Sequence, residues 1–123
     1  MDKIRIAITT TGYEGLDDSV SNIFGKTKTF TLANVEDGKV QNVRIIDNPA
    51  ADYEHGSGPI AAKTLAELKV DLVITSQLGL GASELLQHHK ITTMLVDPSI
   101  KVSEAVKKAL SQLHKQPKKE NNQ

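Results

Sequence analysis

Three short loops of the sequence combine glycine with polar side chains that can bind a ligand. They span residues 9–18, 54–59 and 76–81. Glycine lets a ligand approach the backbone closely, and hydroxyl, amide and imidazole groups donate hydrogen bonds. An imidazole also ligates metals near neutral pH, so His55 is the best side-chain ligand of the set. The candidate binding residues are Thr10, Thr11, Gly12, His55, Gly56, Ser57, Gly58, Gln77, Gly79 and Gly81.

The positions of these loops favour a negatively charged ligand. The loops at 9–18 and 76–81 follow expected strands, and ligands of open α/β sheets bind where strands end. The loops at 54–59 and 76–81 lead into expected helices, whose N-terminal N–H groups and dipoles attract anions. A simpler interpretation stays open at this point: each glycine only permits a tight turn, and His55 is an exposed loop residue without a role.

Patterns that would indicate nucleotide binding or hydrolysis are missing. The run Gly79-Leu80-Gly81 has neither the third glycine of a dinucleotide-binding loop nor the lysine of a P-loop, and no serine lies in a G-x-S-x-G turn. A two-metal phosphoesterase needs converging carboxylates, and the strand expected at 4–9 carries none.

We interpret His88, His89 and His114 as complements to helix C-termini. The aspartates fit turns and element boundaries: Asp17, Asp18, Asp47, Asp71 and Asp97.

Composition excludes further classes. The 123 residues include no cysteine, which excludes a disulfide framework, a zinc ribbon and an iron–sulfur cluster held by protein thiolates. Lys and Arg number 15 and Asp and Glu 15, so the formal net charge is 15 − 15 = 0, which disfavours a nucleic-acid partner. No apolar run approaches the roughly 18 residues that span a membrane. Because the first residues lack the apolar core of a signal peptide, we expect a cytoplasmic protein with no membrane partner.

An antiparallel hairpin is the clearest local structure of the first half. Residues 29–36 and 39–47 have strand character, and Asp37-Gly38 between them is typical of a type I′ turn. Alternating apolar residues predict another strand at 3–9. The hairpin side chains expected to point into the core are Phe30, Leu32, Val35, Val43 and Ile45.

The second half alternates helices and strands. The pattern predicts a helix from Gly58-Pro59 to about residue 68, a strand at 70–75, a short helix after Gly81, a strand at 91–96 and a helix at 102–114. Proline suits the first helical position, so we place Pro59 there and Gly58 before the helix. The apolar faces of the helices comprise Ala61, Thr64, Leu65, Leu68, Leu85, Leu86, Val102, Ala105, Val106, Ala109, Leu110 and Leu113.

This order of elements predicts one α/β domain at residues 1–114. Helices on both faces give a three-layer α/β/α arrangement, and the sheet has five strands with the hairpin as its antiparallel flank. Residues 115–123 are polar and include Pro117, so we predict a disordered tail there.

A set of short motifs, distributed over residues 3–113, points to a known family. The motifs are Lys3–Ile8, Gly15–Ser21, Phe24-Gly25, Asn48–Ala50, His55–Pro59, Ala62, Leu65, Val70–Ile74, Leu78-Gly79 and Ala82. In combination they resemble the dinitrogenase iron–molybdenum cofactor-binding family, which includes NifX-like nitrogenase accessory proteins and the C-terminal domain of NifB-type proteins. The resemblance implies a ribonuclease H-like fold without nuclease activity. It also implies non-covalent binding of the iron–molybdenum cofactor, its iron–sulfur precursor or a related molybdenum–sulfur cluster.

Two positions depart from the family pattern. Ile23 stands where members often have the histidine of a Ser-x-His-Phe-Gly motif, and Ser76-Gln77 stands where they often have two glycines. The first departure removes one cluster ligand, which leaves His55 as the expected metal ligand.

The leading hypothesis is a non-catalytic carrier of a metal–sulfur cluster, with a cluster donor or acceptor protein as its partner. Such a cluster is a bulky polyanion that brings its own sulfide, so backbone N–H groups and helix dipoles can hold it without thiolates. One alternative is a regulatory or protein-interaction module of the same fold that no longer binds a cluster. Another is a divalent-metal phosphoesterase, which would depend on the scattered aspartates alone.

Overall fold

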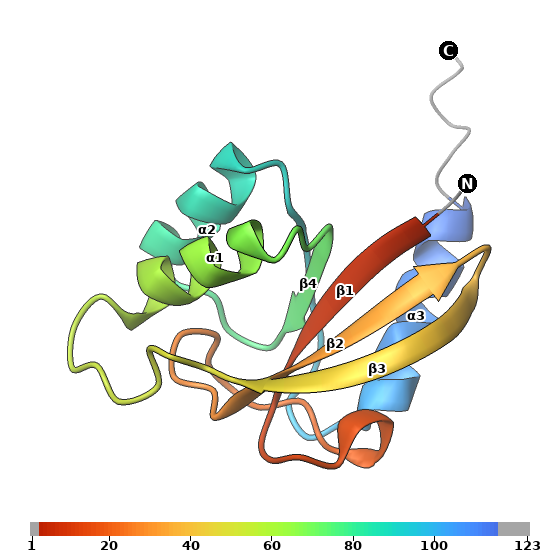
Figure 1. Cartoon of the computed structure of the whole chain (residues 1–123), viewed down its shortest axis with the longest axis horizontal. Coiled ribbons are helices and arrows are strands. Elements are labelled where there is room, and N and C mark those ends of the chain that lie inside the picture. The colour runs from red at the N-terminus through yellow and green to blue at the C-terminus, as the bar shows by residue number, and fades with distance from the viewer. Residues whose placement is uncertain (1–2, 116–123) are drawn as a thin grey trace.

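A five-stranded mixed sheet forms the middle of the fold, as seen in a computed structural model that describes residues 3–115 (Figure 1). The strands are β1 (Lys3–Thr10), β2 (Thr29–Glu36), β3 (Lys39–Asp47), β4 (Leu72–Thr75) and β5 (Thr92–Leu95). Their spatial order is β3-β2-β1-β4-β5. β2 pairs antiparallel with both β1 and β3, whereas β1, β4 and β5 run parallel. The predicted mixed sheet is confirmed.

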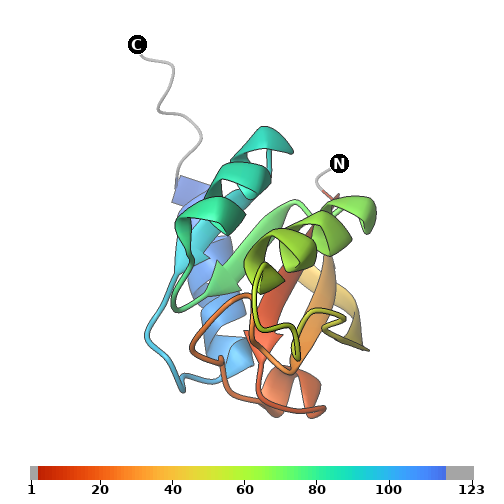
Figure 2. The ribbon, with the colours of Figure 1, turned by 90° about the vertical axis from the view of Figure 1, so that its left-hand side faces the viewer.

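Helices cover both faces of the sheet (Figure 2). α1 (Ser57–Glu67) and α2 (Leu80–His88) pack on one face, where Phe30, Leu65 and Leu86 are fully buried with their neighbours. α3 (Val102–Lys115) packs on the other face, where its Val106 belongs to a second apolar cluster with Ile8 of β1. The three-layer prediction is therefore confirmed, and β4 is buried along its whole length because both faces are covered.

The hairpin forms as predicted. Asp37 and Gly38 have φ values of 54° and 80°, the positive values that a type I′ turn requires. One expectation differs, because Phe30 and Leu32 face α1 and α2, whereas Val35 is buried in the cluster under α3. β2 lies inside the sheet, so both of its faces are buried. β3 is an edge strand, and the predicted core residues Val43 and Ile45 are only half-buried there.

Two details of the helices differ from the sequence-based expectation. α1 begins at Ser57, so Gly58 is helical and Pro59 is the third helical residue. Proline costs nothing there, because the first four N–H groups of a helix have no partner within it. In α3 the apolar packing ends at Leu110, and Leu113 is 42% exposed rather than part of the core.

The predicted tail lies almost entirely outside the described residues. Of the predicted tail at 115–123, only Lys115 lies within the described residues, as the last residue of α3; residues 116–123 lie outside them. Among the described helices none is long and apolar enough to cross a membrane.

Candidate functional site

A shallow cavity of about 240 Å³ lies where the N-termini of α1 and α2 meet. Its third wall is a short irregular segment, residues 22–25, which follows the loop after β1. The lining residues are Ile23, Phe24, Gly25, Gly56, Ser57, Gly58, Pro59, Gly79, Gly81 and Ala82. None of them is acidic, so no carboxylate in the lining opposes a negatively charged ligand.

Both helix N-termini at this cavity present backbone donors. Gly56, with φ 75°, precedes α1, and Gly79, with φ −72°, precedes α2. Neither glycine has a side chain, and neither helix receives a side-chain cap from the described residues. First-turn N–H groups have no partner inside a helix, and the dipole adds positive potential at the same point. Two such ends at one cavity favour an anionic ligand.

Close backbone approaches hold the three walls together. A Cβ atom on Gly25 would lie 2.8 Å from the Ser57 hydroxyl oxygen, so only glycine fits against the start of α1. A Cβ on Gly58 would lie 3.2 Å from the Cβ of Ala82, so the two helices are in tight contact there. These glycines therefore pack elements together, in addition to lining the cavity.

The segment 22–25 is fixed by hydrogen bonds to the loop after β4. Gln77 N–H donates to the Asn22 carbonyl oxygen at 2.9 Å, and Phe24 N–H donates to the Gln77 carbonyl oxygen at 3.0 Å. Ile23 and Gln77 thus form an isolated parallel bridge. Gln77 acts here through its backbone, and its side chain is exposed and does not line the cavity.

The structure places Thr10, Thr11 and Gly12 away from this cavity. Thr10 is fully buried, and its hydroxyl shares hydrogen bonds with Thr29 and Thr31 on β2. The Thr11 hydroxyl and the Gly12 N–H both donate to the carboxylate of Asp18, at 2.7 and 3.0 Å. All three residues therefore stabilise the loop after β1.

Asp18 is the centre of that loop. Besides Thr11 and Gly12, the backbone N–H groups of Glu14 and Ser19 donate to its carboxylate at 3.3 and 2.7 Å. Burial raises the pKa of this carboxyl group, but the four donated hydrogen bonds outweigh burial and hold the pKa below its ordinary value. Asp18 is thus a structural anion whose oxygens are already occupied.

His55 is exposed and lies beside the cavity, directly before Gly56, but it does not line it. Within residues 3–115 no group of three or more His, Cys, Asp or Glu side chains is placed to hold a metal ion. The donor set at the cavity is therefore backbone N–H, the Ser57 hydroxyl and one nearby imidazole. That set suits an anion or a preformed cluster better than a bare metal ion.

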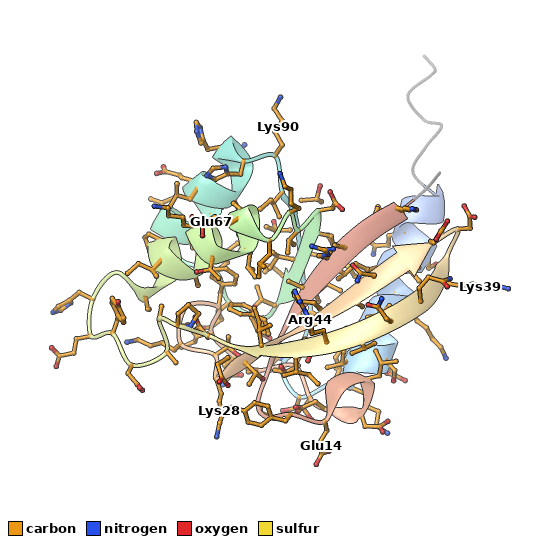
Figure 3. All side chains as sticks on the ribbon, in the orientation of Figure 1. Glu14, Lys28, Lys39, Arg44, Glu67 and Lys90 are labelled. Atoms are coloured by element: carbon orange, nitrogen blue, oxygen red, sulfur yellow. The ribbon has the colours of Figure 1, made fainter. Side chains whose placement is uncertain are left out.

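The labelled charged side chains of Figure 3 carry both signs. Lys90 points outward at the top of the view, Lys39 at the right, and Lys28 and Glu14 at the lower edge (Figure 3). At the cavity itself, the attraction for an anion comes from the two helix ends, whose first-turn N–H groups lack partners within their helices.

Sequence analysis missed half of the cavity lining, namely Ile23, Phe24, Gly25, Pro59 and Ala82. The signal was present in part, because Phe24-Gly25, Pro59 and Ala82 belong to the motifs that carry the family resemblance. These residues have no reactive side chains, so their role follows only from where the fold places them.

Fold and site together define a small α/β domain with a cavity at the N-termini of two helices. The family described as dinitrogenase iron–molybdenum cofactor matches residues 2–112, and the chain belongs to this family. It is a family of cofactor-binding accessory domains rather than of catalysts.

Solved structures and one further sequence are similar to this chain. The apo form of the orange protein from Desulfovibrio gigas is 29% identical with a TM-score of 0.80, covering 88% of each chain. A candidate NifB protein from Thermotoga is 30% identical with a TM-score of 0.70, covering 89% of this chain and 88% of that one. An uncharacterised protein of Methanocaldococcus jannaschii is 28% identical over 91 residues, which is 70% of this chain and 77% of that protein.

Proposed function

We propose that this protein is a non-catalytic carrier of a metal–sulfur cluster. The cargo would be the iron–molybdenum cofactor, its iron–sulfur precursor or a related molybdenum–sulfur cluster, received from or passed to a partner protein. The observation that carries the proposal is the meeting of two uncapped helix N-termini at one cavity without acidic residues. Membership of the cofactor-binding family supports the same conclusion.

The proposed site is narrower than the set selected from sequence. Backbone N–H groups at Ser57, Gly58 and Gly81 would donate to sulfide, since sulfide at a cluster surface carries negative charge. Gly56 and Gly79 leave the helix ends open to the cargo. His55 would reach the cluster from the rim, as a metal ligand or as an N–H donor.

The remaining selected residues have indirect roles in this proposal. Gln77 holds the wall formed by residues 22–25 through its backbone hydrogen bonds. Thr10, Thr11 and Gly12 stabilise the neighbouring loop through β2 and Asp18. We therefore do not place their side chains against the cargo.

Anaerobic reconstitution tests the proposal. The purified chain is incubated without oxygen with isolated iron–molybdenum cofactor or with tetrathiomolybdate, a molybdenum–sulfide dianion, and then passed through gel filtration. We expect metal to elute with the protein and to give a visible absorption band. If wild-type protein retains neither compound, the carrier function is wrong. The variant His55→Ala is compared with His89→Ala, which removes an exposed histidine at the C-terminal end of α2. If His55→Ala retains as much metal as the wild type, only the role of His55 is wrong.

One observation favours a second candidate function. Ile23 is 47% exposed on the cavity wall, at the position where family members often carry a histidine. An exposed apolar side chain there suits a protein contact better than a cluster ligand. A regulatory or interaction module would retain no metal and would instead co-purify with a stable partner, and Ile23→Ser would release that partner.

A further inference from the structure

A buried asparagine joins the walls of the cavity from behind. Asn48 directly follows β3 and is only 5% exposed. Its side-chain amide donates to the carbonyl oxygens of Gly25 and Thr27, at 3.0 and 2.9 Å. Its side-chain oxygen accepts from the Ala50 N–H at 3.0 Å. Both N–H bonds of this amide and its oxygen therefore have partners.

Two of these bonds connect separate chain segments, which are also linked by the Lys26 ammonium group donating to the Tyr53 carbonyl oxygen. Gly25 and Thr27 belong to the segment that forms one cavity wall, and we call residues 22–27 the wall segment. Ala50 is fully buried at the start of the loop that leads to His55 and the N-terminus of α1. Asn48 thus fixes the wall segment relative to the loop that carries the opposite side of the site.

The wall segment is packed so tightly against α1 that there is no room for even one added carbon atom at Gly25. Gly25 is already so close to α1 that a Cβ atom would lie 2.6 Å from the Gly58 nitrogen. The Gly58 N–H is one of the donors proposed to face the cargo. A displacement of Gly25 by a fraction of an ångström therefore changes how open that donor is.

We propose that Asn48 is a positioning residue of the cluster-binding site, holding the wall segment at the distance from α1 that leaves the first-turn N–H groups accessible. This inference rests on the proposed carrier function. Asn48 does not line the cavity, so its side chain would not contact the cargo.

The chemistry of the three bonds requires asparagine. An aspartate of the same shape has no N–H to donate, and its charge would face two carbonyl oxygens that repel it. Glutamine keeps the amide but is longer by one methylene, so it would push the wall segment away. Asn48→Asp is therefore the severe variant and Asn48→Gln the mild one.

The experiment is a binding titration with tetrathiomolybdate, followed by visible absorption under conditions where unfolding curves show every variant to be folded. We expect Asn48→Asp to weaken binding by about tenfold or more, the effect of losing two buried hydrogen bonds, and Asn48→Gln to weaken it less. The matched control is Asn42→Asp, since Asn42 is exposed on β3 and only accepts a hydrogen bond, from Asn34. That control should bind as the wild type does.

A double-mutant cycle separates positioning from general stabilisation. Gly25→Ala moves the same wall segment by a steric route, so its effect on affinity should not add to that of Asn48→Asp. A residue that only stabilises the fold would lower the unfolding midpoint and leave the affinity of the folded protein unchanged. Equal affinity of wild type and both Asn48 variants overturns the inference.

Failure of the carrier function is distinguishable from failure of this inference. If wild-type protein binds no cluster, amide resonances of the cluster-free protein still decide whether Asn48 positions the site. We then expect Asn48→Asp and Asn48→Gln to shift the resonances of Gly25, Gly56 and Gly58, with little change in Gly38 at the far hairpin turn. Unchanged site resonances would show that Asn48 does not position these residues.

Discussion

Gly25 lies against the first turn of α1 at a distance that no other residue allows, since its Cβ would be 2.6 Å from the backbone nitrogen of Gly58. The contact joins the wall of the cavity to one of the two helix ends whose N–H groups we propose as hydrogen-bond donors to an anion. A substitution at Gly25 must therefore displace backbone, because two of the three nearest atoms are the backbone nitrogen and Cα of Gly58. This contact makes Gly25 the most sensitive glycine of the site.

Gly25→Ala should destabilise the protein by about 1–3 kcal/mol, the cost of overpacking a tight contact. The free energy of unfolding is measured by urea titration. Gly12→Ala is the matched control, because a Cβ there would be 3.6 Å from the nearest atom, a carboxylate oxygen of Asp18, which is an ordinary contact. Equal stability of the two variants would mean that the 22–25 segment is not packed against α1.

Gly79→Asp should separate the stability of α2 from its attraction for anions. Gly79 has an ordinary φ of −72°, and a Cβ there meets no atom within 4 Å. An aspartate at this N-cap position accepts hydrogen bonds from the first turn, so the helix gains a few tenths of a kcal/mol. The same carboxylate repels a polyanion, so tetrathiomolybdate binding should weaken by more than about tenfold, which corresponds to about 1.4 kcal/mol.

Two comparisons make this prediction specific. Gly79→Asn caps the helix in the same way without the charge, so it should bind tetrathiomolybdate more tightly than Gly79→Asp does. Ser111→Asp adds the same charge on the exposed face of α3 and should have no effect. If the Asp and Asn variants at position 79 bind equally, the cavity does not select for anions.

Local chemistry made much of the fold predictable. Both hairpin strands match their predicted bounds, because Asp37-Gly38 fixes the turn through its own backbone preference. The side on which Val35 is buried was not predictable in this way. Alternation identifies one buried face, and β2 has two because it lies between β1 and β3. The start of α1 was misplaced for a related reason: proline is tolerated throughout a first turn, so Pro59 does not mark its first residue.

The candidate site was predictable only at the glycine-containing N-termini of the helices. Gly56, Ser57, Gly58, Gly79 and Gly81 meet at the cavity, in keeping with the rule that helix N-termini attract anions. The contribution of Gly25 depends on a contact with a helix far along the chain, and Asn48 depends on hydrogen bonds across the same gap. No local pattern of residues encodes such contacts.

Gly38→Ala should cost about 1 kcal/mol of stability through backbone conformation alone. Gly38 has φ 80°, and a Cβ there would meet nothing within 4 Å, so no steric contact contributes. Asparagine tolerates positive φ better than alanine does, so Gly38→Asn should remain closer to the wild type. Urea unfolding of the three proteins checks the order, and an alanine variant as stable as the asparagine variant would contradict it.

Asp18 should give the protein an acid-sensitive contribution to stability. Because its folded-state pKa is lowered, its carboxylate stabilises the folded protein above the unfolded-state pKa of about 3.9. That stabilisation is lost as the pH falls through the lower folded-state pKa. Asp18→Asn should lower the free energy of unfolding at pH 7 by about 1–3 kcal/mol, since the donors to one of the two oxygens would face an amide NH2 group that cannot accept. It should also make the decline at acid pH shallower. Asp17→Asn removes the neighbouring exposed carboxylate and should change neither quantity. Urea titrations from neutral to acid pH compare the three proteins, and parallel pH curves for the wild type and Asp18→Asn would show that the carboxylate of Asp18 is not the stabilising group.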